Sequence, residues 1–259
     1  MAELDRSWTR SWQNHPNPAG RIVCFGPAGA SANFFRGWSR RVPADLEVLG
    51  LAYPGRERRF EEAPIEDMAT LADAVARVLA PHMTVPTVLF GHSMGASVAF
   101  EVARRLEEHD HGPLGLALSG RQSPRRQREL PSGVAGFDDE QIIGHLHELG
   151  GTPPEMLVDP DFRDLVLPAF RTDFTLIGTY LPDLQPVLDT PVTVLLGNRD
   201  REVFEGDADR WRETTRRFTG LAVFPGGHFY LIEKEAEVVA HVVRFLSAQR
   251  TRALPWPPA

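Results

Sequence analysis

The fold is decided by the stretch Thr87-Val88-Leu89-Phe90-Gly91-His92-Ser93-Met94-Gly95, which an apolar, helix-like run at 96–103 follows. The apolar run 87–90 predicts a buried strand, and the spacing of apolar residues after it predicts a helix. Between them the two glycines of a G-x-S-x-G turn remove Cβ atoms that would collide across a sharp bend. The pattern predicts a nucleophile elbow with the Ser93 hydroxyl at its apex. The alternative is that Ser93 only caps the following helix.

Similar apolar runs along the chain predict further strands at 21–25, 46–53, 114–119, 192–196 and 221–224. Apolar residues at three- and four-residue spacing predict helices at 33–41, 68–81, 93–108, 208–218 and 233–249. Strands that alternate with helices of this length favour right-handed crossover connections. We therefore expect an α/β fold, in which a mainly parallel central sheet is covered by helices on both faces.

Residues 121–190 break this alternation, because they contain no convincing strand. Two amphipathic stretches, 138–149 and 161–180, are joined by Gly150-Gly151-Thr152-Pro153-Pro154. Since ligands bind at the carboxyl edge of open α/β sheets, we expect a helical lid or substrate wall there; an ordinary decorative insertion is the alternative. We expect a single domain over 1–259, with a flexible, proline-rich tail at 250–259.

The composition limits the class of protein. The chain has 259 residues, of which 42% are hydrophobic, and this is enough for one large core. A net charge of −7 gives a nucleic-acid partner no support. The lone Cys24 excludes an internal disulfide and fits a buried strand position. Without an apolar leader or a membrane-length segment, we expect a cytoplasmic protein with no membrane contact. Because the chain is expected to form one compact domain, we also expect a monomer.

A serine nucleophile needs an imidazole to take its proton and a carboxylate to hold that imidazole. Asp200 follows the strand predicted at 192–196, and His228 follows the strand predicted at 221–224. The chain order Ser93, Asp200, His228 is that of α/β-hydrolases. Glu202 is the nearest competitor for the acid. We expect His92 to point away from the nucleophile.

The oxyanion formed by such an attack needs two backbone N–H donors. Met94 follows the nucleophile and supplies the first donor. The second is expected from the loop after the first parallel strand, where Ala28 is favoured because Pro27 has no N–H. This glycine-containing loop lacks both G-x-G-x-x-G and a Walker lysine, so we expect no nucleotide there. We also expect no metal and no other cofactor.

With these residues placed, the chain resembles the stand-alone type II thioesterases of polyketide synthase and nonribosomal peptide synthetase pathways, in the α/β-hydrolase superfamily. The segments that carry the resemblance are Cys24-Phe25 running into Ala28-Gly29, Tyr53-Pro54-Gly55-Arg56, the elbow 91–95, Arg171-Thr172-Asp173-Phe174 leading to Tyr180, and Gly226-Gly227-His228-Phe229-Tyr230. One departure is Pro27, where the family usually has histidine. The change spares the backbone donor at Ala28 but puts the rigidity of the loop in question.

The resemblance implies an activity and its partners. It implies hydrolysis of acyl thioesters on the phosphopantetheine arm of acyl or peptidyl carrier proteins, which removes aberrant or stalled units. It gives Ser93, Asp200 and His228 the triad roles, and Ala28 and Met94 the oxyanion roles. Since such carriers are commonly acidic, the arginine groupings at 56–59 and 121–128 are candidate docking residues.

Three alternatives to this function remain. A carboxylesterase or lipase of the same fold would share the triad and elbow. A non-catalytic, hydrolase-like docking or sensing protein is disfavoured, because no member of the triad is missing. A chain-releasing domain of a larger synthase is also conceivable. However, the chain starts with Met1 and shows no carrier motif, so we expect a free-standing protein.

Overall fold

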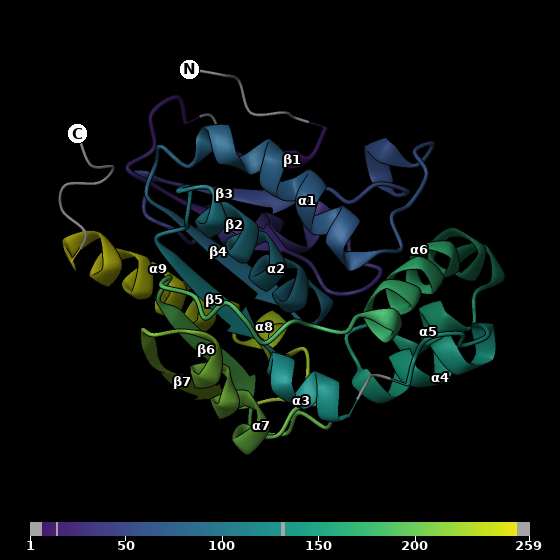
Figure 1. Ribbon diagram of the computed structural model, residues 1–259. Helices are drawn as coiled ribbons and strands as arrows, with labels where there is room; N and C mark the ends of the chain where they lie inside the picture. The colour runs from purple at the N-terminus through teal and green to yellow at the C-terminus, as the bar shows by residue number, and fades with distance from the viewer. Residues whose placement is uncertain (1–6, 14, 131–132, 253–259) are drawn as a thin grey trace.

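The computed structural model describes residues 7–13, 15–130 and 133–252 and contains a seven-stranded sheet in the order β1-β3-β2-β4-β5-β6-β7 (Figure 1). Six of these strands pair in parallel: β2 (Gly20–Phe25), β3 (Leu46–Leu51), β4 (Thr87–His92), β5 (Gly115–Ser119), β6 (Val192–Gly197) and β7 (Phe218–Phe224). The edge strand β1 (Thr9–Ser11) runs antiparallel to β3 and was not predicted. Three residues are too few to show an alternating pattern. The predicted α/β fold with a mainly parallel sheet is confirmed.

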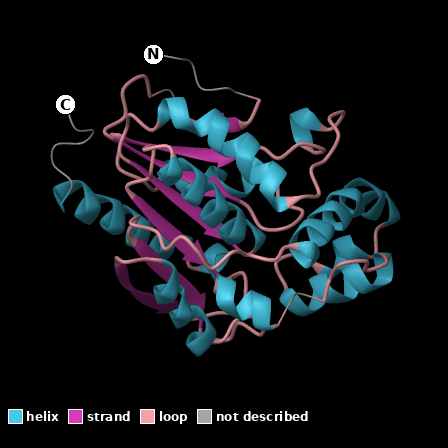
Figure 2. Cartoon of the chain, in the orientation of Figure 1, coloured by secondary structure: helices cyan, strands magenta, loops and turns pink. Residues whose placement is uncertain are grey.

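Helices cover both faces of this sheet (Figure 2). On one face α1 (Met68–Leu79) and α2 (Met94–Glu108) pack against side chains such as Val23 and Phe25. On the other face α9 (Glu235–Arg252) and the 3₁₀ helix η1 (Ala32–Arg40) pack against Ile22 and Cys24. Successive residues of β2 therefore pack into the hydrophobic cores on opposite faces of the sheet, which explains the apolar run over residues 22–25.

The prediction of one helix over 208–218 is wrong. Helix α7 (Glu205–Asp209) and the 3₁₀ helix η4 (Arg210–Thr214) come first, and Phe218 already begins β7. Thr215 is extended, because it forms a bridge with Leu188 and its hydroxyl donates to the carbonyl of Thr190. A tertiary contact thus overrides the helical spacing of this segment.

The predicted tail at 250–259 begins too early. Helix α9 continues to Arg252, because the prolines that stop a helix come only at 255, 257 and 258. Residues 253–259 lie outside the described part of the chain.

We call residues 121–190 the helical insertion. Its described residues, 121–130 and 133–190, contain four helices between β5 and β6: α3 (Pro124–Glu129), α4 (Asp139–Leu149), α5 (Pro154–Leu157) and α6 (Pro160–Thr179). Asp138 and Gln141 form a capping box at the start of α4, and Asp159 caps α6. Helices α4 to α6 lie beyond the carboxyl ends of the central strands, on the right in Figure 1. The short α3 and α5 were not predicted.

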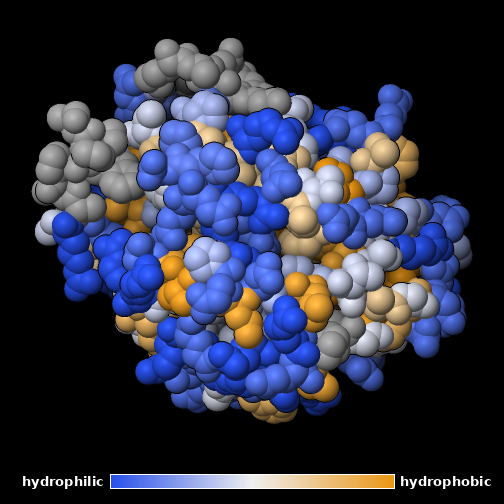
Figure 3. All heavy atoms as spheres, viewed as in Figure 1, coloured by the Kyte–Doolittle hydropathy of each residue, from blue (hydrophilic) through white to orange (hydrophobic). Residues whose placement is uncertain are grey.

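The surface seen in Figure 3 is mostly hydrophilic, with apolar side chains in small scattered groups. Within the described ranges, no helix combines the length and the apolar character that crossing a bilayer demands.

Candidate active site

Ser93 occupies the sharp turn between β4 and α2 with a φ of 55° and a ψ of −122°. A Cβ on Gly91 would lie 2.2 Å from the carbonyl oxygen of Gly95, and one on Gly95 would lie 2.2 Å from that of Phe25. Backbone therefore excludes any side chain at either glycine. The Ser93 N–H donates to the Ser119 carbonyl at 2.8 Å, while its hydroxyl makes no capping bond with α2. The capping alternative is wrong.

Asp200 and His228 meet beyond the ends of β6 and β7. The Asp200 Oδ2 lies 2.9 Å from His228 Nδ1, and both side chains are buried. The other carboxylate oxygen accepts the N–H groups of Glu202 at 2.9 Å and Val203 at 3.2 Å. Glu202, the rival acid, is itself exposed and contributes only its backbone to this contact. The carboxylate of Asp200 is thus fixed at both oxygens.

The ring of His228 has one nitrogen free. A carboxylate only accepts hydrogen bonds, so the neutral ring carries its proton on Nδ1 and a lone pair on Nε2. That Nε2 is buried and has no hydrogen-bond partner among the described residues. A proton acceptor is therefore available on the side of the ring away from Asp200.

Ser93 and His228 line one cavity of about 480 Å³, together with Ala28 and Met94. Much of its remaining wall comes from apolar residues of the helical insertion: Leu130, Val134, Phe137, Leu146, Leu149, Phe162, Val166, Phe170, Phe174 and Ile177. Asp200 does not line the cavity and lies behind His228. No group of three metal-binding side chains occurs in the ranges that the structure describes.

The backbone N–H groups of Ala28 and Met94, both at this cavity, donate to no acceptor within the described residues. The neighbouring N–H of Gly29 is taken by Asp173 Oδ2 at 2.7 Å, and that of Ala30 by the Pro27 carbonyl at 3.1 Å. Both donors expected from the sequence are thus free of intramolecular acceptors, and their oxyanion role stays a prediction. The proline in place of the family's histidine leaves a loop that is still held by hydrogen bonds.

His92 is a buried part of the site that sequence reasoning did not recognise. Its Nδ1 lies 2.9 Å from the Ser119 hydroxyl, which in turn contacts the Tyr230 hydroxyl at 2.7 Å. Its ring centroid lies 5.0 Å from that of His228, while the side chain stays outside the cavity lining. Burial, and then the proximity of His228, hold the pKa of His92 well below its usual value. His92 is therefore a neutral ring that supports His228 from behind.

The first arginine grouping, at 56–59, is largely turned inward. Arg56 is buried against Asp173, and Arg59 pairs with Glu62 at 2.6 Å and stacks over Trp8. Only Arg58 of this grouping is exposed.

The second grouping, at 121–128, is also committed to this chain. Arg121 is partly buried at the cavity wall, where it donates to two neutral acceptors, Ser97 and Gln127, and burial lowers its pKa to about 10. The others bind the carboxylates of Glu213 and Asp207 and the carbonyl of Pro182. Both groupings are therefore weak candidates for docking an acidic carrier protein.

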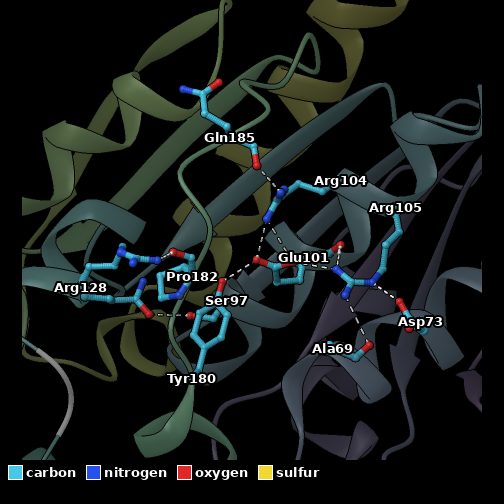
Figure 4. A network of polar contacts seen from close by, with 11 residues as sticks. Ala69, Asp73, Ser97, Glu101, Arg104, Arg105, Arg128, Tyr180, Pro182 and Gln185 are labelled. Atoms are coloured by element: carbon cyan, nitrogen blue, oxygen red, sulfur yellow. Dashed lines mark hydrogen bonds and ion pairs between the residues drawn. The ribbon is translucent and has the colours of Figure 1, made fainter.

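A polar network ties the helix that starts at the elbow to the end of the helical insertion (Figure 4). Buried Glu101 on α2 accepts the Tyr180 hydroxyl at 2.7 Å and pairs with Arg104 and Arg105. Arg104 also donates to the carbonyl of Gln185, beyond the insertion's last helix. Burial and the nearby Glu101 raise the pKa of Tyr180. Its phenol therefore remains a hydrogen-bond donor.

Comparison with known proteins identifies the family. Residues 20–249 match the family model described as "Thioesterase domain". Thioesterase PikA5 of Streptomyces venezuelae is 37% identical over 233 residues, which are 89% of this chain and 82% of that protein. The gramicidin S biosynthesis protein GrsT of Aneurinibacillus migulanus is 33% identical over 87% of this chain and 88% of its own. The solved structure of BorB, a type II thioesterase from the borrelidin biosynthetic cluster, has a TM-score of 0.86 at 34% identity and covers 95% of this chain and 100% of that one.

These matches extend over the sheet, the elbow and the helical insertion alike. They confirm the resemblance drawn from the sequence: the chain is a hydrolase of the thioesterase family and belongs to its type II thioesterases of polyketide and nonribosomal peptide pathways.

Proposed function

We propose that Ser93, His228 and Asp200 form the catalytic triad, and that the enzyme hydrolyses acyl groups held as thioesters on the phosphopantetheine arm of acyl or peptidyl carrier proteins. The observation that carries this proposal is the buried, unpartnered Nε2 of His228 in a cavity that Ser93 also lines. Asp200 holds the opposite nitrogen of that ring at 2.9 Å. This is the arrangement that a general base needs.

In the first half-reaction the Ser93 oxygen attacks the thioester carbonyl and His228 Nε2 takes its proton. The carbonyl oxygen becomes an oxyanion, which the free N–H groups of Ala28 and Met94 stabilise. The C–S bond then breaks and the acyl group remains on Ser93. His228 returns the proton to the pantetheine sulfur, although a thiol with a pKa of about 8.5 needs less assistance than an alkoxide.

In the second half-reaction water replaces the thiol. His228 takes a proton from the water as it attacks the acyl-serine ester, and the same two N–H groups hold the second oxyanion. Collapse of this intermediate returns the proton to the Ser93 oxygen and releases the carboxylic acid. The enzyme needs no cofactor for this sequence.

The helical insertion acts in this proposal as a lid and acyl wall over a single domain. Its support is the cavity, to which α4 and α6 contribute a large group of apolar side chains. An apolar wall of this kind binds a hydrocarbon portion of an acyl group and excludes water from the ester. The proposal also includes a monomer as the working form and the cytoplasm as its compartment.

The decisive test is the hydrolysis of acyl-pantetheine and acyl-carrier thioesters by the wild type and by Ser93→Ala. We expect the variant to lose nearly all turnover while it retains its fold, and a serine-reactive probe to label only the wild type. Matched oxygen esters, assayed beside the thioesters, distinguish the carboxylesterase alternative. Wild-type turnover by Ser93→Ala, or a preference for the oxygen esters, overturns the proposal.

A further inference from the structure

A buried ion pair connects the helical insertion to the body of the protein at the cavity. Arg56 follows β3, whereas Asp173 lies in α6, 117 residues later. Their two parallel contacts are 2.6 Å from Nη2 to Oδ1 and 2.9 Å from Nη1 to Oδ2. Only 10% and 4% of the two side chains are exposed. The pair is therefore bidentate and shielded from water, which makes its geometry well defined.

Both members of this pair also bind the loop that carries Ala28. Asp173 Oδ2 accepts the Gly29 N–H at 2.7 Å, and Arg56 Nη1 donates to the Ala30 carbonyl at 3.0 Å. One turn earlier on α6, the Phe170 ring lies 2.2 Å from where a Gly29 Cβ would be. With a φ of +71°, Gly29 adopts a backbone conformation that favours glycine and lets the helix approach this closely.

The contact at Gly29 fixes the orientation of a peptide plane. Because the peptide bond is planar, holding the Gly29 N–H also holds the carbonyl of Ala28, on the same plane. The hydrogen bond from Ala30 to the Pro27 carbonyl closes the turn on the other side. The free Ala28 N–H lies in the preceding plane, that of the Pro27 carbonyl, so the hydrogen bonds of Gly29 and Ala30 on neighbouring planes together set its orientation.

A stability role alone does not account for this pair. Buried ion pairs contribute little net stability, and apolar replacements of similar volume are often as stable. Here, in addition, the carboxylate is aimed at a single backbone N–H of the loop that carries a free donor.

We propose that Asp173 and Arg56 are positioning residues, which orient the Ala28 N–H toward the oxyanion and make a complete oxyanion hole depend on α6 being seated. The inference rests on the proposed function, because it assigns Ala28 its oxyanion role. It means that a helix of the insertion, besides lining the cavity, controls the rate of the chemical step.

The test is Asp173→Asn, which keeps the shape of the side chain but removes its charge. Removal of a whole oxyanion donor costs about 10²–10³ in kcat, so we expect a misoriented donor to lower kcat by about 10- to 100-fold. With a small acyl-pantetheine thioester as substrate, KM should stay within about twofold of wild type. A trifluoromethyl ketone analogue, whose adduct carries an oxyanion, should lose affinity by the same factor as kcat. A non-hydrolysable thioether analogue should not.

The matched control is Glu47→Gln. Glu47 pairs with Arg21 at 2.9 Å and is equally buried, but this pair lies at the amino ends of β2 and β3, away from the cavity. The Glu47→Gln variant should lose stability as Asp173→Asn does, while its kcat and its affinity for the ketone analogue stay unchanged. If Asp173→Asn does not fold, the double variant Arg56→Met with Asp173→Leu replaces the pair by apolar groups of similar volume. It should fold, with kcat reduced as above.

A folded variant with kcat within about twofold of wild type, or one that weakens the ketone and thioether analogues equally, overturns the positioning role. This failure is distinct from that of the proposed function. Loss of turnover in Ser93→Ala together with normal turnover in Asp173→Asn rejects only the positioning role, whereas an active Ser93→Ala rejects the mechanism itself.

Discussion

Replacement of the buried His92 by glutamine should make folding less sensitive to acid. His92 lies behind His228 with its Nδ1 2.9 Å from the Ser119 hydroxyl, and its pKa is held well below the usual value. In the unfolded chain the same ring titrates at about 6.5. As the pH falls through that value, the unfolded state takes up a proton that the folded state refuses. Stability is therefore complete above this pH and decreases below it.

The size of the effect follows from proton linkage. A ring that stays neutral in the folded state and titrates at about 6.5 when unfolded costs about 2 kcal/mol of unfolding free energy between pH 7 and pH 5. The limiting slope is about 1.4 kcal/mol per pH unit, which corresponds to one proton. The titratable groups that face His92 are His228 and Tyr230, with ring centroids 5.0 and 6.3 Å away. Both remain in the variant, so to first order their contributions cancel in the comparison.

The assay is urea unfolding of the wild type and His92→Gln at a series of pH values from 7 to 5. We expect the two stabilities to converge toward low pH, because only the wild type carries the buried ring. The variant is expected to be less stable at neutral pH, but this does not affect the test, because the quantity compared is the change in unfolding free energy with pH. Parallel pH dependences for the two proteins would refute the reasoning, because they would mean that His92 is protonated equally in the folded and unfolded states.

Three further changes test the packing around the site. Gly95→Ala places a Cβ 2.2 Å from the Phe25 carbonyl oxygen, so we expect no cooperative thermal transition; a normal melting curve would contradict the described elbow. Tyr180→Phe removes one hydrogen bond to the charged Glu101, which keeps Arg104 and Arg105 as partners, and should cost about 1.5–3 kcal/mol in urea unfolding, a prediction that an unchanged midpoint rejects. Trp211→Ala empties a fully buried position and should cost about 3–5 kcal/mol, with kcat retained wherever the variant is folded.

The sequence was informative about the proposed triad because the signals of its members are local. Ser93 is flanked by Gly91 and Gly95. A Cβ at either position would lie 2.2 Å from a backbone carbonyl oxygen, so the elbow requires glycine at both. Asp200 and His228 directly follow apolar runs that form β6 and β7. Parallel strands bring their carboxyl ends to one edge of the sheet, so position along the chain was enough to group them.

The contacts that the sequence did not reveal join segments far apart. Arg56 and Asp173 both lie in segments that resemble the family, but the contact between them depends on how α6 packs over the loop at Gly29. The arginine groupings suggested a basic surface, because the position of an arginine in the sequence does not show which group its long, flexible side chain reaches. Arg121 instead donates to acceptors on two different helices.

The helical insertion gives this enzyme a particular capacity for change. Most of the apolar wall belongs to one continuous piece of chain, while Ser93 and His228 belong to loops of the sheet. Substrate range can therefore diverge by exchange of that single piece, without any alteration of the reacting groups. The contacts of Gly29 limit the exchange. A foreign segment must place an aromatic ring against Gly29, as Phe170 does, and one turn later a carboxylate that accepts the Gly29 N–H, as Asp173 does. Chimaeras between family members will succeed or fail at that junction.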